Sequence, residues 1–345
     1  MLRPILSEET IASLKSAIEK STVVAIFTHK GPDGDAIGSS LALAQYLESL
    51  GKFVSVYTPN AFPDFLHWLP TSQKIIQHDK HAATAEMMAA KADLMFCLDF
   101  NTLDRIGDVA PLVSANSCTK VLIDHHLQPG DFCDITISQP SASSTCELVY
   151  RVLDALGATD AISKNIATCI YCGMMTDTGG FTYNSNNSEI YYIISQLLLT
   201  GIDKDKIYRN VFNNYSESRF RLMGYILYEK MVYYPEFNAS LITLTKEEQK
   251  RFSYLRGDTE GIVNIPLQIK GARLSISLRE DTESGVIRVS LRSVDDFPCN
   301  KVAAEFFNGG GHLNASGGEL HCSIDEAIVI VKQALVKYQP LLVKK

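Results

Sequence analysis

Histidine and aspartate side chains recur along the first half of this sequence, most of them directly after a short apolar run. They are His29, Asp33, Asp35, Asp99, Asp124, His125, His126 and Asp177. Carboxylates brought close together repel and raise one another's pKa unless cations neutralise them, so a cluster of this kind calls for metal ions. Mixed carboxylate and imidazole ligands suit manganese, magnesium or iron better than structural zinc, which prefers thiolates.

The chemistry that such a cluster predicts is phosphate-ester hydrolysis. Two divalent ions about 3.5–4 Å apart, bridged by a carboxylate, form the usual site for that reaction. A single aspartate after a strand is more often a helix cap or a turn residue. Several His and Asp residues at successive strand ends favour a shared site instead.

The elements that must position these residues follow from the apolar pattern. Short apolar runs alternate with helical patterns, which is typical of βαβ units around a parallel sheet and predicts an α/β fold. We expect strands at 23–28, 53–57, 94–98 and 121–123, and helices at 36–50, 145–156 and 163–176. Ligands of such a sheet bind beyond the carboxyl ends of its strands, so the His and Asp residues should converge there.

The length of 345 residues allows about two domains. We expect a catalytic, metal-binding domain at 1–188, a helical connector at 189–237 and a smaller α+β substrate-binding domain at 238–345. In the last of these, the pattern predicts strands at 240–244, 274–278 and 287–291, helices at 302–307 and 325–338, and a glycine-rich loop at 309–318. The substrate cleft is expected between the two larger domains.

The glycine-rich segment contains a second candidate site. Gly309, Gly310 and Gly311 stand together before His312. Glycines let backbone N–H groups approach an anion closely, and an imidazole can add a hydrogen bond or a charge. A tight turn would explain two glycines but not three followed by histidine, so we expect a phosphate-binding loop.

Composition narrows the class of partner. The 32 Lys and Arg residues against 39 Asp and Glu give a net charge of −7, which argues against binding long duplex nucleic acid. No apolar run is long enough for a membrane span and the first residues do not form a signal peptide, so we expect a cytoplasmic protein without a membrane partner. Cys169 and Cys172 have a motif spacing, but core packing is the simpler interpretation in a reducing compartment.

The order of these segments resembles the DHH phosphoesterase family. The run His29-Lys-Gly-Pro-Asp33-Gly-Asp35, then Asp99, the triplet at 124–126 and Asp177 are similar to its four motifs. The run at 309–317 resembles the GGGH signature of the DHH-associated C-terminal domain, subfamily 1. Length and domain order resemble the stand-alone nanoRNase/pAp phosphatase members, also labelled exopolyphosphatase-related proteins. The resemblance covers nearly the whole chain.

The resemblance also implies a role for each matched residue. It implies two divalent ions, Mn²⁺ before Mg²⁺ or Co²⁺, held by His29, Asp33, Asp35, Asp99, His125 and Asp177. Asp33 and Asp35 would serve different ions, and Asp99 and Asp177 would be shared. The implied catalytic residues are Asp99, Asp124, His125 and His126. Asp124 would orient its neighbours, and His126 would contact the scissile phosphate or the leaving-group oxygen. The alternative for His126 is a structural hydrogen bond.

In the second domain, the resemblance implies that Arg292 reaches the substrate phosphate, with Ser293 beside it. Gly309, Gly310, Gly311 and His312 would complete that phosphate site. Asn308 departs from the pattern, because the family often has a further glycine there.

The expected activity is hydrolysis of short oligoribonucleotides, of 3′-phosphoadenosine 5′-phosphate, or of both. A short RNA or small nucleotide is the expected substrate, and a homodimer is compatible with this interpretation. The alternatives are a cyclic-di-AMP or pApA phosphodiesterase, a RecJ-type exonuclease and, from another class, a non-catalytic nucleotide-binding sensor. All six metal ligands are present, which argues against the sensor.

Overall fold

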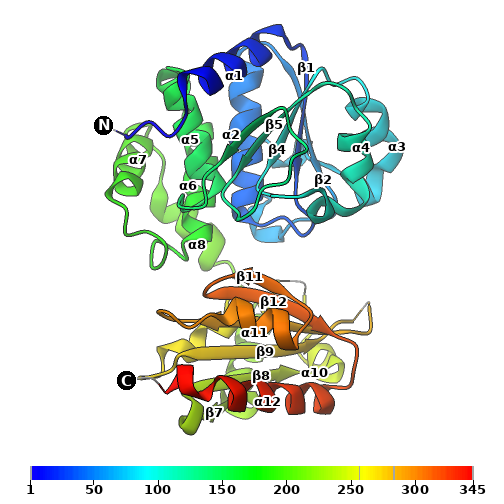
Figure 1. Cartoon of the computed structure of the whole chain (residues 1–345), viewed down its shortest axis with the longest axis vertical. Coiled ribbons are helices and arrows are strands. Elements are labelled where there is room, and N and C mark those ends of the chain that lie inside the picture. Colours follow the sequence, from blue (N-terminus) through cyan, green and yellow to red (C-terminus); the bar gives the residue numbers. More distant parts are fainter. Residues whose placement is uncertain (1, 256, 283, 344–345) are drawn as a thin grey trace. The chain divides into compact units, whose positions relative to one another are not determined.

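The computed structural model describes residues 2–255, 257–282 and 284–343, which form two compact units (Figure 1). Unit 1 extends to Asn214 and unit 2 begins at Tyr215. The segment expected as a connector is divided between them. Helices α7 (Ser188–Leu199) and α8 (Lys204–Phe212) belong to unit 1, and α9 (Glu217–Tyr225) belongs to unit 2.

Unit 1 is built on a parallel six-stranded sheet, which confirms the predicted α/β class. Its strands are β1 (Val23–Thr28), β2 (Phe53–Thr58), β3 (Ile76–Gln77), β4 (Leu94–Leu98), β5 (Thr119–Asp124) and β6 (Ile135–Ser138). They lie in the order β3-β2-β1-β4-β5-β6, and every pair is parallel. The order reverses between β1 and β4, and such a switch point opens a crevice at the carboxyl ends of the strands.

Helices cover both faces of this sheet. They are α1 (Glu8–Lys20), α2 (Gly34–Ser49), α3 (His78–Ala89), α4 (Ala110–Ser114), α5 (Thr145–Ala155) and α6 (Lys164–Asp177). Helix α7 packs on α5 and α6, and α8 packs on α6. Alternate residues of each strand enter different cores: Val24 and Ile26 pack in the cluster that contains residues of α2, α5 and α6, whereas Ala25 and Phe27 pack with residues of α3 and α4. Strands buried on both faces explain why their sequences read as unbroken apolar runs.

The interior of unit 1 accounts for the two cysteines with a motif spacing. Cys169 and Cys172 lie on α6 and are fully buried in the core, which confirms core packing. Burial raises the pKa of the Cys169 thiol to about 12. No helix among the described residues is long and apolar enough to cross a membrane.

Unit 2 is a mixed sheet with helices. Its further elements are β7 (Val232–Tyr234), β8 (Ala239–Leu244), α10 (Lys246–Arg251), β9 (Leu274–Glu280), β10 (Ile287–Ser293), α11 (Cys299–Phe306), β11 (Gly310–His312), β12 (Ala315–Leu320) and α12 (Ile324–Leu342). The strand order is β11-β12-β10-β9-β8-β7, and only the described pair β8–β9 is parallel. One face of the sheet packs on α11 and α12.

The glycine-rich segment at 309–318 is a hairpin of β11 and β12, so the prediction of a loop was wrong over most of this range. Glycine is uncommon in strands, but here the chain must pass very close to itself. A Cβ on Gly309 would lie 1.9 Å from the carbonyl oxygen of Gly317, and one on Gly311 would lie 2.6 Å from that of Ala315. Close packing therefore explains two of the three glycines, while the space beside Gly310 is open.

Candidate active site

The eight His and Asp residues of unit 1 lie together at the carboxyl ends of β1, β4 and β5, around the switch point of the sheet. Three groups of their ligand atoms are close enough to hold a metal ion: His29, Asp33 and Asp99; Asp35, His125 and Asp177; and Asp99, His125 and His126. Within the described part of the chain, Asp177 belongs to the second group alone.

Asp99 stands between two of these groups. Its Oδ2 lies 3.4 Å from Nε2 of His29, and its Oδ1 lies 3.6 Å from Nε2 of His125. The residue takes a φ of +65°, which is a strained, left-handed conformation for a residue other than glycine. The Oγ1 of Thr145 donates a hydrogen bond of 3.0 Å to the same Oδ1. One carboxylate thus presents a different oxygen to each group.

The two ligand histidines are oriented by backbone carbonyls. Nδ1 of His29 donates to the carbonyl oxygen of Lys30 at 3.1 Å, and Nδ1 of His125 lies 3.4 Å from that of Ala142. Since a carbonyl can only accept, the proton sits on Nδ1 and leaves Nε2 as the ligand atom that faces the carboxylates. Burial lowers the pKa of His29 against the opposing effect of Asp33, which favours the neutral, metal-binding imidazole.

The carboxylates carry an electrostatic cost. Burial, followed by the charges of Asp35, Asp33, Asp177 and Asp124, raises the pKa of Asp99 well above its usual range. The pKa of Asp177 is raised for the same reasons, first by burial and then by the other carboxylates. A set of acids this crowded favours protonation unless cations enter, which is the donor chemistry expected of a divalent metal site.

Asp33 and Asp35 lie at the start of α2, where their carboxylates make hydrogen bonds to backbone N–H groups and also belong to the cluster. The Oδ1 of Asp33 caps this helix by accepting from the backbone N–H of Asp35 and Ala36 at 3.0 and 3.1 Å. Asp33 is therefore a helix cap, as the alternative interpretation held. It also belongs to the cluster, because the same Oδ1 lies 3.9 Å from Nε2 of His29.

A contact that the sequence did not reveal holds Asp35. Its two carboxylate oxygens accept from the backbone N–H groups of Thr145 at 2.6 Å and Cys146 at 2.8 Å, at the amino terminus of α5. A helix amino terminus stabilises negative charge, so these bonds oppose the burial that raises the pKa of Asp35. Ser144 caps α5, and this cap at the start of an apolar helix was the only sequence signal.

His126 points to a different partner from His125. Its Nδ1 donates to Oδ1 of Asp124 at 2.7 Å, and its backbone N–H donates to Oδ2 of the same carboxylate at 3.1 Å. Asp124 is fully buried and fixes the ring, whose centroid lies 4.9 Å from that of His125. This hydrogen bond directs Nε2, rather than Nδ1, toward any ligand.

In unit 2 the strand register brings Arg292 and His312 onto one face of the sheet. Arg292 pairs with Ala315, and Ala315 pairs with His312. Residues paired directly across strands share a face, and two strand spacings of about 4.8 Å separate their backbones by roughly 10 Å. Gly310 lies two residues from His312 on that same face. Asn308 takes a φ of +48°, which asparagine tolerates, so the departure from glycine there costs little.

Ser293 does not join this row, which corrects its expected place beside Arg292 at the phosphate. It is on the opposite face of β10 and is buried. Its Oγ donates to the carbonyl of Phe297 at 2.8 Å and accepts from Nδ2 of Asn314 at 2.9 Å. These contacts hold the turn that follows β10, so Ser293 has a structural role here.

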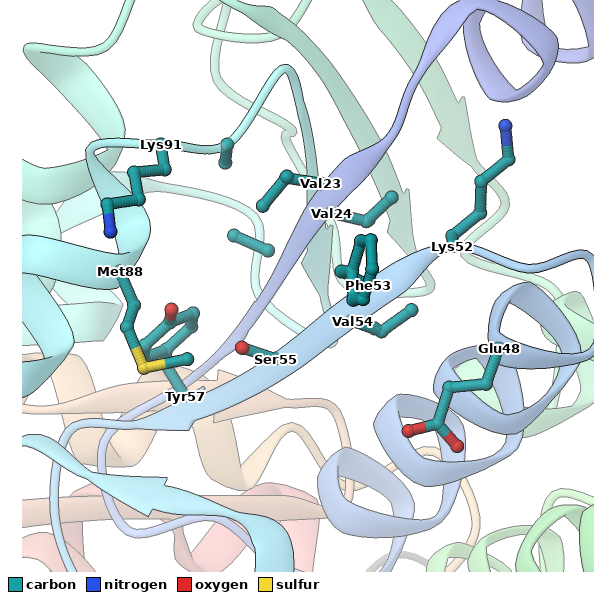
Figure 2. A pocket seen from close by; sticks show the side chains of 12 residues that line it. Val23, Val24, Glu48, Lys52, Phe53, Val54, Ser55, Tyr57, Met88 and Lys91 are labelled. Carbon is teal, nitrogen blue, oxygen red and sulfur yellow. The ribbon is translucent and has the colours of Figure 1, made fainter.

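A hollow of about 350 Å³ in unit 1 lies apart from this site (Figure 2). It runs along β1 and β2 and is flanked by Lys52, Phe53, Met88 and Lys91. The described lining residues contain no histidine or aspartate, and most of the strand residues come from the amino-terminal halves of their strands. The candidate active site is therefore the cluster at the carboxyl ends.

Comparison with known proteins agrees with this geometry. The DHH family, N-terminal domain, matches residues 23–174, and the DHHA1 domain matches residues 243–337. The chain belongs to the DHH family, as the resemblance of its motifs predicted.

Its relatives include proteins of similar length. It is 29% identical over 326 residues to the bifunctional oligoribonuclease and PAP phosphatase NrnA of Thermus thermophilus, covering 94% of this chain and 92% of that one. It is 55% identical to an exopolyphosphatase-related protein of Bacteroides fragilis, whose crystal structure superposes with a TM-score of 0.96 and covers 99% of this chain and 100% of that one. The cyclic-di-AMP phosphodiesterase GdpP of Geobacillus thermodenitrificans is 25% identical over 94% of this chain but 49% of its own length.

Proposed function

We propose that this protein is a metal-dependent phosphoesterase that hydrolyses short oligoribonucleotides, 3′-phosphoadenosine 5′-phosphate, or both. The observation that carries the proposal is Asp99, whose two oxygens face two separate groups of ligands at the switch point of the sheet. Relatives that cover most of the chain and are named as oligoribonuclease and PAP phosphatase support the substrate class.

The ligands fit two divalent ions, with Mn²⁺ as the first candidate. His29, Asp33 and Asp99 would hold one ion, and Asp35, His125 and Asp177 would hold the other. Oδ1 of Asp99 lies 3.6 Å from Nε2 of His125 in the second group. When bound, such ions supply Lewis-acid stabilisation of the phosphate and a water of lowered pKa.

The protein's own groups would orient the ligand side chains and supply a proton to the substrate. The N–H groups at the start of α5 would orient Asp35 and favour its charged form against burial, and backbone carbonyls fix both histidine tautomers. Asp124 holds His126 through Nδ1–H, so that Nε2 would face the substrate. Nε2 could donate to the scissile phosphate or the leaving oxygen only from the doubly protonated ring, which would return to its neutral form when that proton is transferred. Loss of Asp124 should therefore displace the ring of His126.

Unit 2 would bind the far phosphate of the substrate. Arg292 and His312 share a face, and the small side chain of Ala315 lies between them in register. Arginine can bind phosphate through two parallel hydrogen bonds, and the open space beside Gly310 admits an anion to the backbone. An anchor for one terminal phosphate favours short substrates over long polymers.

A substrate panel tests the proposal. Dinucleotides, oligoribonucleotides of three to five residues, 3′-phosphoadenosine 5′-phosphate, cyclic di-AMP and pApA would be incubated with the protein and Mn²⁺, and the products mapped. We expect release of nucleoside monophosphates from the short RNAs or of phosphate from 3′-phosphoadenosine 5′-phosphate, with no turnover by the Asp99→Asn variant. Preferred cleavage of cyclic di-AMP would favour the activity named for GdpP, and tight binding of every nucleotide without turnover would replace the enzyme by a sensor.

A further inference from the structure

The segment that follows Asp177 is a compact turn that keeps Tyr183 near the metal ligands. The backbone N–H of Tyr183 donates to the carbonyl of Thr178 at 3.2 Å, and that of Gly180 donates to Met175 at 2.8 Å. The Oγ1 of Thr178 accepts from the N–H of Phe181 at 3.1 Å. Because Thr178 is the next residue after Asp177, these bonds hold Tyr183 within about one turn of a ligand carboxylate.

This turn is held in an unusual backbone conformation. Gly179, Gly180 and Phe181 take φ values of +55°, +72° and +65°, all in the left-handed region. A left-handed phenylalanine is strained and persists only where its surroundings fix it. Phe181 packs against the core of unit 1, and its ring centroid lies 5.6 Å from that of Tyr171. Packing of Phe181 against the core therefore fixes the backbone of the turn that carries Tyr183.

Two tyrosines lie against the glycine pair of this turn. A Cβ on Gly179 would lie 2.2 Å from Cε1 of Tyr183, and one on Gly180 would lie 3.6 Å from Cε2 of Tyr208 on α8. Helix α8 packs on α6, the helix that ends in Asp177 (Figure 1). Tyr183 is 54% exposed and Tyr208 is 46% exposed, although each has one side against backbone. Glycine at position 179 lets the ring of Tyr183 lie directly against the backbone of the turn.

We propose that Tyr183 and Tyr208 form a nucleobase subsite that receives the base of the nucleotide whose phosphate is at the metal ligands. The inference rests on the proposed function and names the part of the substrate that these rings recognise. An exposed aromatic surface beside a phosphate-handling site matches the stacking platforms that bind single-stranded nucleotides. Stacking accepts any base, because every base presents a π-face, so the subsite favours nucleotides over simple phosphate esters without selecting a sequence.

The experiment compares a ligand that has a base with one that lacks it. Dissociation constants of AMP and ribose 5-phosphate would be measured by calorimetry in Mn²⁺ for the wild type, Tyr183→Ala, Tyr208→Ala and Tyr183→Phe. Tyr191→Ala is the matched control, since Tyr191 lies on α7 in the same unit and is 50% exposed. Melting temperatures of all variants would establish that each is folded.

We expect the wild type to bind AMP about tenfold more tightly than ribose 5-phosphate, as base stacking generally contributes. Either alanine variant at 183 or 208 should reduce this ratio to about threefold or less without changing the affinity for ribose 5-phosphate, while Tyr183→Phe and Tyr191→Ala keep it. The subsite would be overturned if Tyr183→Ala left the affinity ratio of AMP to ribose 5-phosphate unchanged, or if it lowered the affinity for both ligands equally. Failure of the proposed function is a separate result: it would appear as absence of turnover in the wild-type substrate panel, whatever the binding ratio.

Discussion

The site depends on close packing between α6 and the elements that carry Asp35 and Cys146, and Gly173→Ala tests this directly. An added Cβ would lie 2.2 Å from Sγ of Cys146 and 3.0 Å from Oδ1 of Asp35. The first distance is roughly 1.3 Å inside ordinary contact, which begins at about 3.5 Å. Cys146 is fully buried, so its sulfur has little room to move aside.

The expected change in stability is the difference between two effects. Overpacking a core costs about 1–3 kcal/mol, and replacing glycine by alanine inside a helix returns about 0.5–1 kcal/mol. A net loss of about 1–2 kcal/mol lowers the melting temperature of a unit of this size by roughly 2–8 °C. Because the new methyl group also presses on Asp35, the stabilisation that Mn²⁺ confers should shrink as well.

Thermal unfolding with EDTA and with Mn²⁺ would measure both effects. Gly224→Ala is the control, since this glycine lies on α9 and an added Cβ would meet nothing within 4 Å; the substitution should leave stability unchanged or raise it. In the double variant with Cys146→Ala, the space vacated by the sulfur should accept the methyl group and recover about 1 kcal/mol or more relative to the sum of the single changes. A Gly173→Ala protein as stable as the wild type, with unchanged Mn²⁺ stabilisation, would refute the packing argument.

Further outcomes concern charge and substrate. Asp99→Asn should lower hydrolysis by about 10²–10³-fold or more in a folded protein, and full activity with unchanged metal content would contradict its assignment. In EDTA, the melting temperature of the wild type should fall as pH rises above about 4, because the raised pKa of Asp99 keeps a proton on the folded chain that the unfolded chain has released; a slope that Asp99→Asn leaves unchanged would count against this. Arg292→Ala should raise KM about tenfold with kcat nearly constant, whereas Arg279→Ala on the neighbouring strand should change neither, and equal effects of the two would argue against a phosphate anchor. Asp124→Asn should lower kcat, because the amide can present an N–H to Nδ1 and so favour the other tautomer of His126, and an unchanged kcat would leave Asp124 a purely structural role.

Local patterns predicted the part of the fold that bears the candidate metal ligands. Strands β1, β4 and β5 are buried on both faces and read as apolar runs, and the residues that follow them belong to the cluster. Short or weakly patterned elements escaped prediction: β3 has two residues, β6 has four, and α3 is rich in alanine and histidine with a non-helical backbone at His81. Their positions depend on tertiary contacts, which the spacing of apolar residues in the sequence does not indicate.

Contacts between distant segments account for most of what the sequence did not reveal at the site. The bond from Thr145 to Asp35 joins residues 110 positions apart, so only the assembled fold could place the start of α5 over that carboxylate. Gly309 and Gly311 indicated a loop because glycine is usually depleted in strands, yet both are required by the close approach of β11 and β12. For Ser293 the prediction failed because of proximity in sequence. Ser293 is the next residue after Arg292, and adjacent residues of a strand face opposite sides of the sheet.

The electrostatics of the cluster also favour the proposed metal-dependent enzyme over a metal-free nucleotide sensor. Asp35, Asp99 and Asp177 all have a raised pKa, because each is buried among other carboxylates. In a protein that bound nucleotides without metal, these carboxylates would repel phosphate and destabilise the fold to the extent that they stayed charged, and only protonation would offset the two effects. Divalent cations reverse both, since they neutralise the carboxylates and attract the phosphate. The N–H groups of α5 favour the charged form of Asp35 but do not overcome its burial, so bound cations would complete a stabilisation that the fold provides only in part.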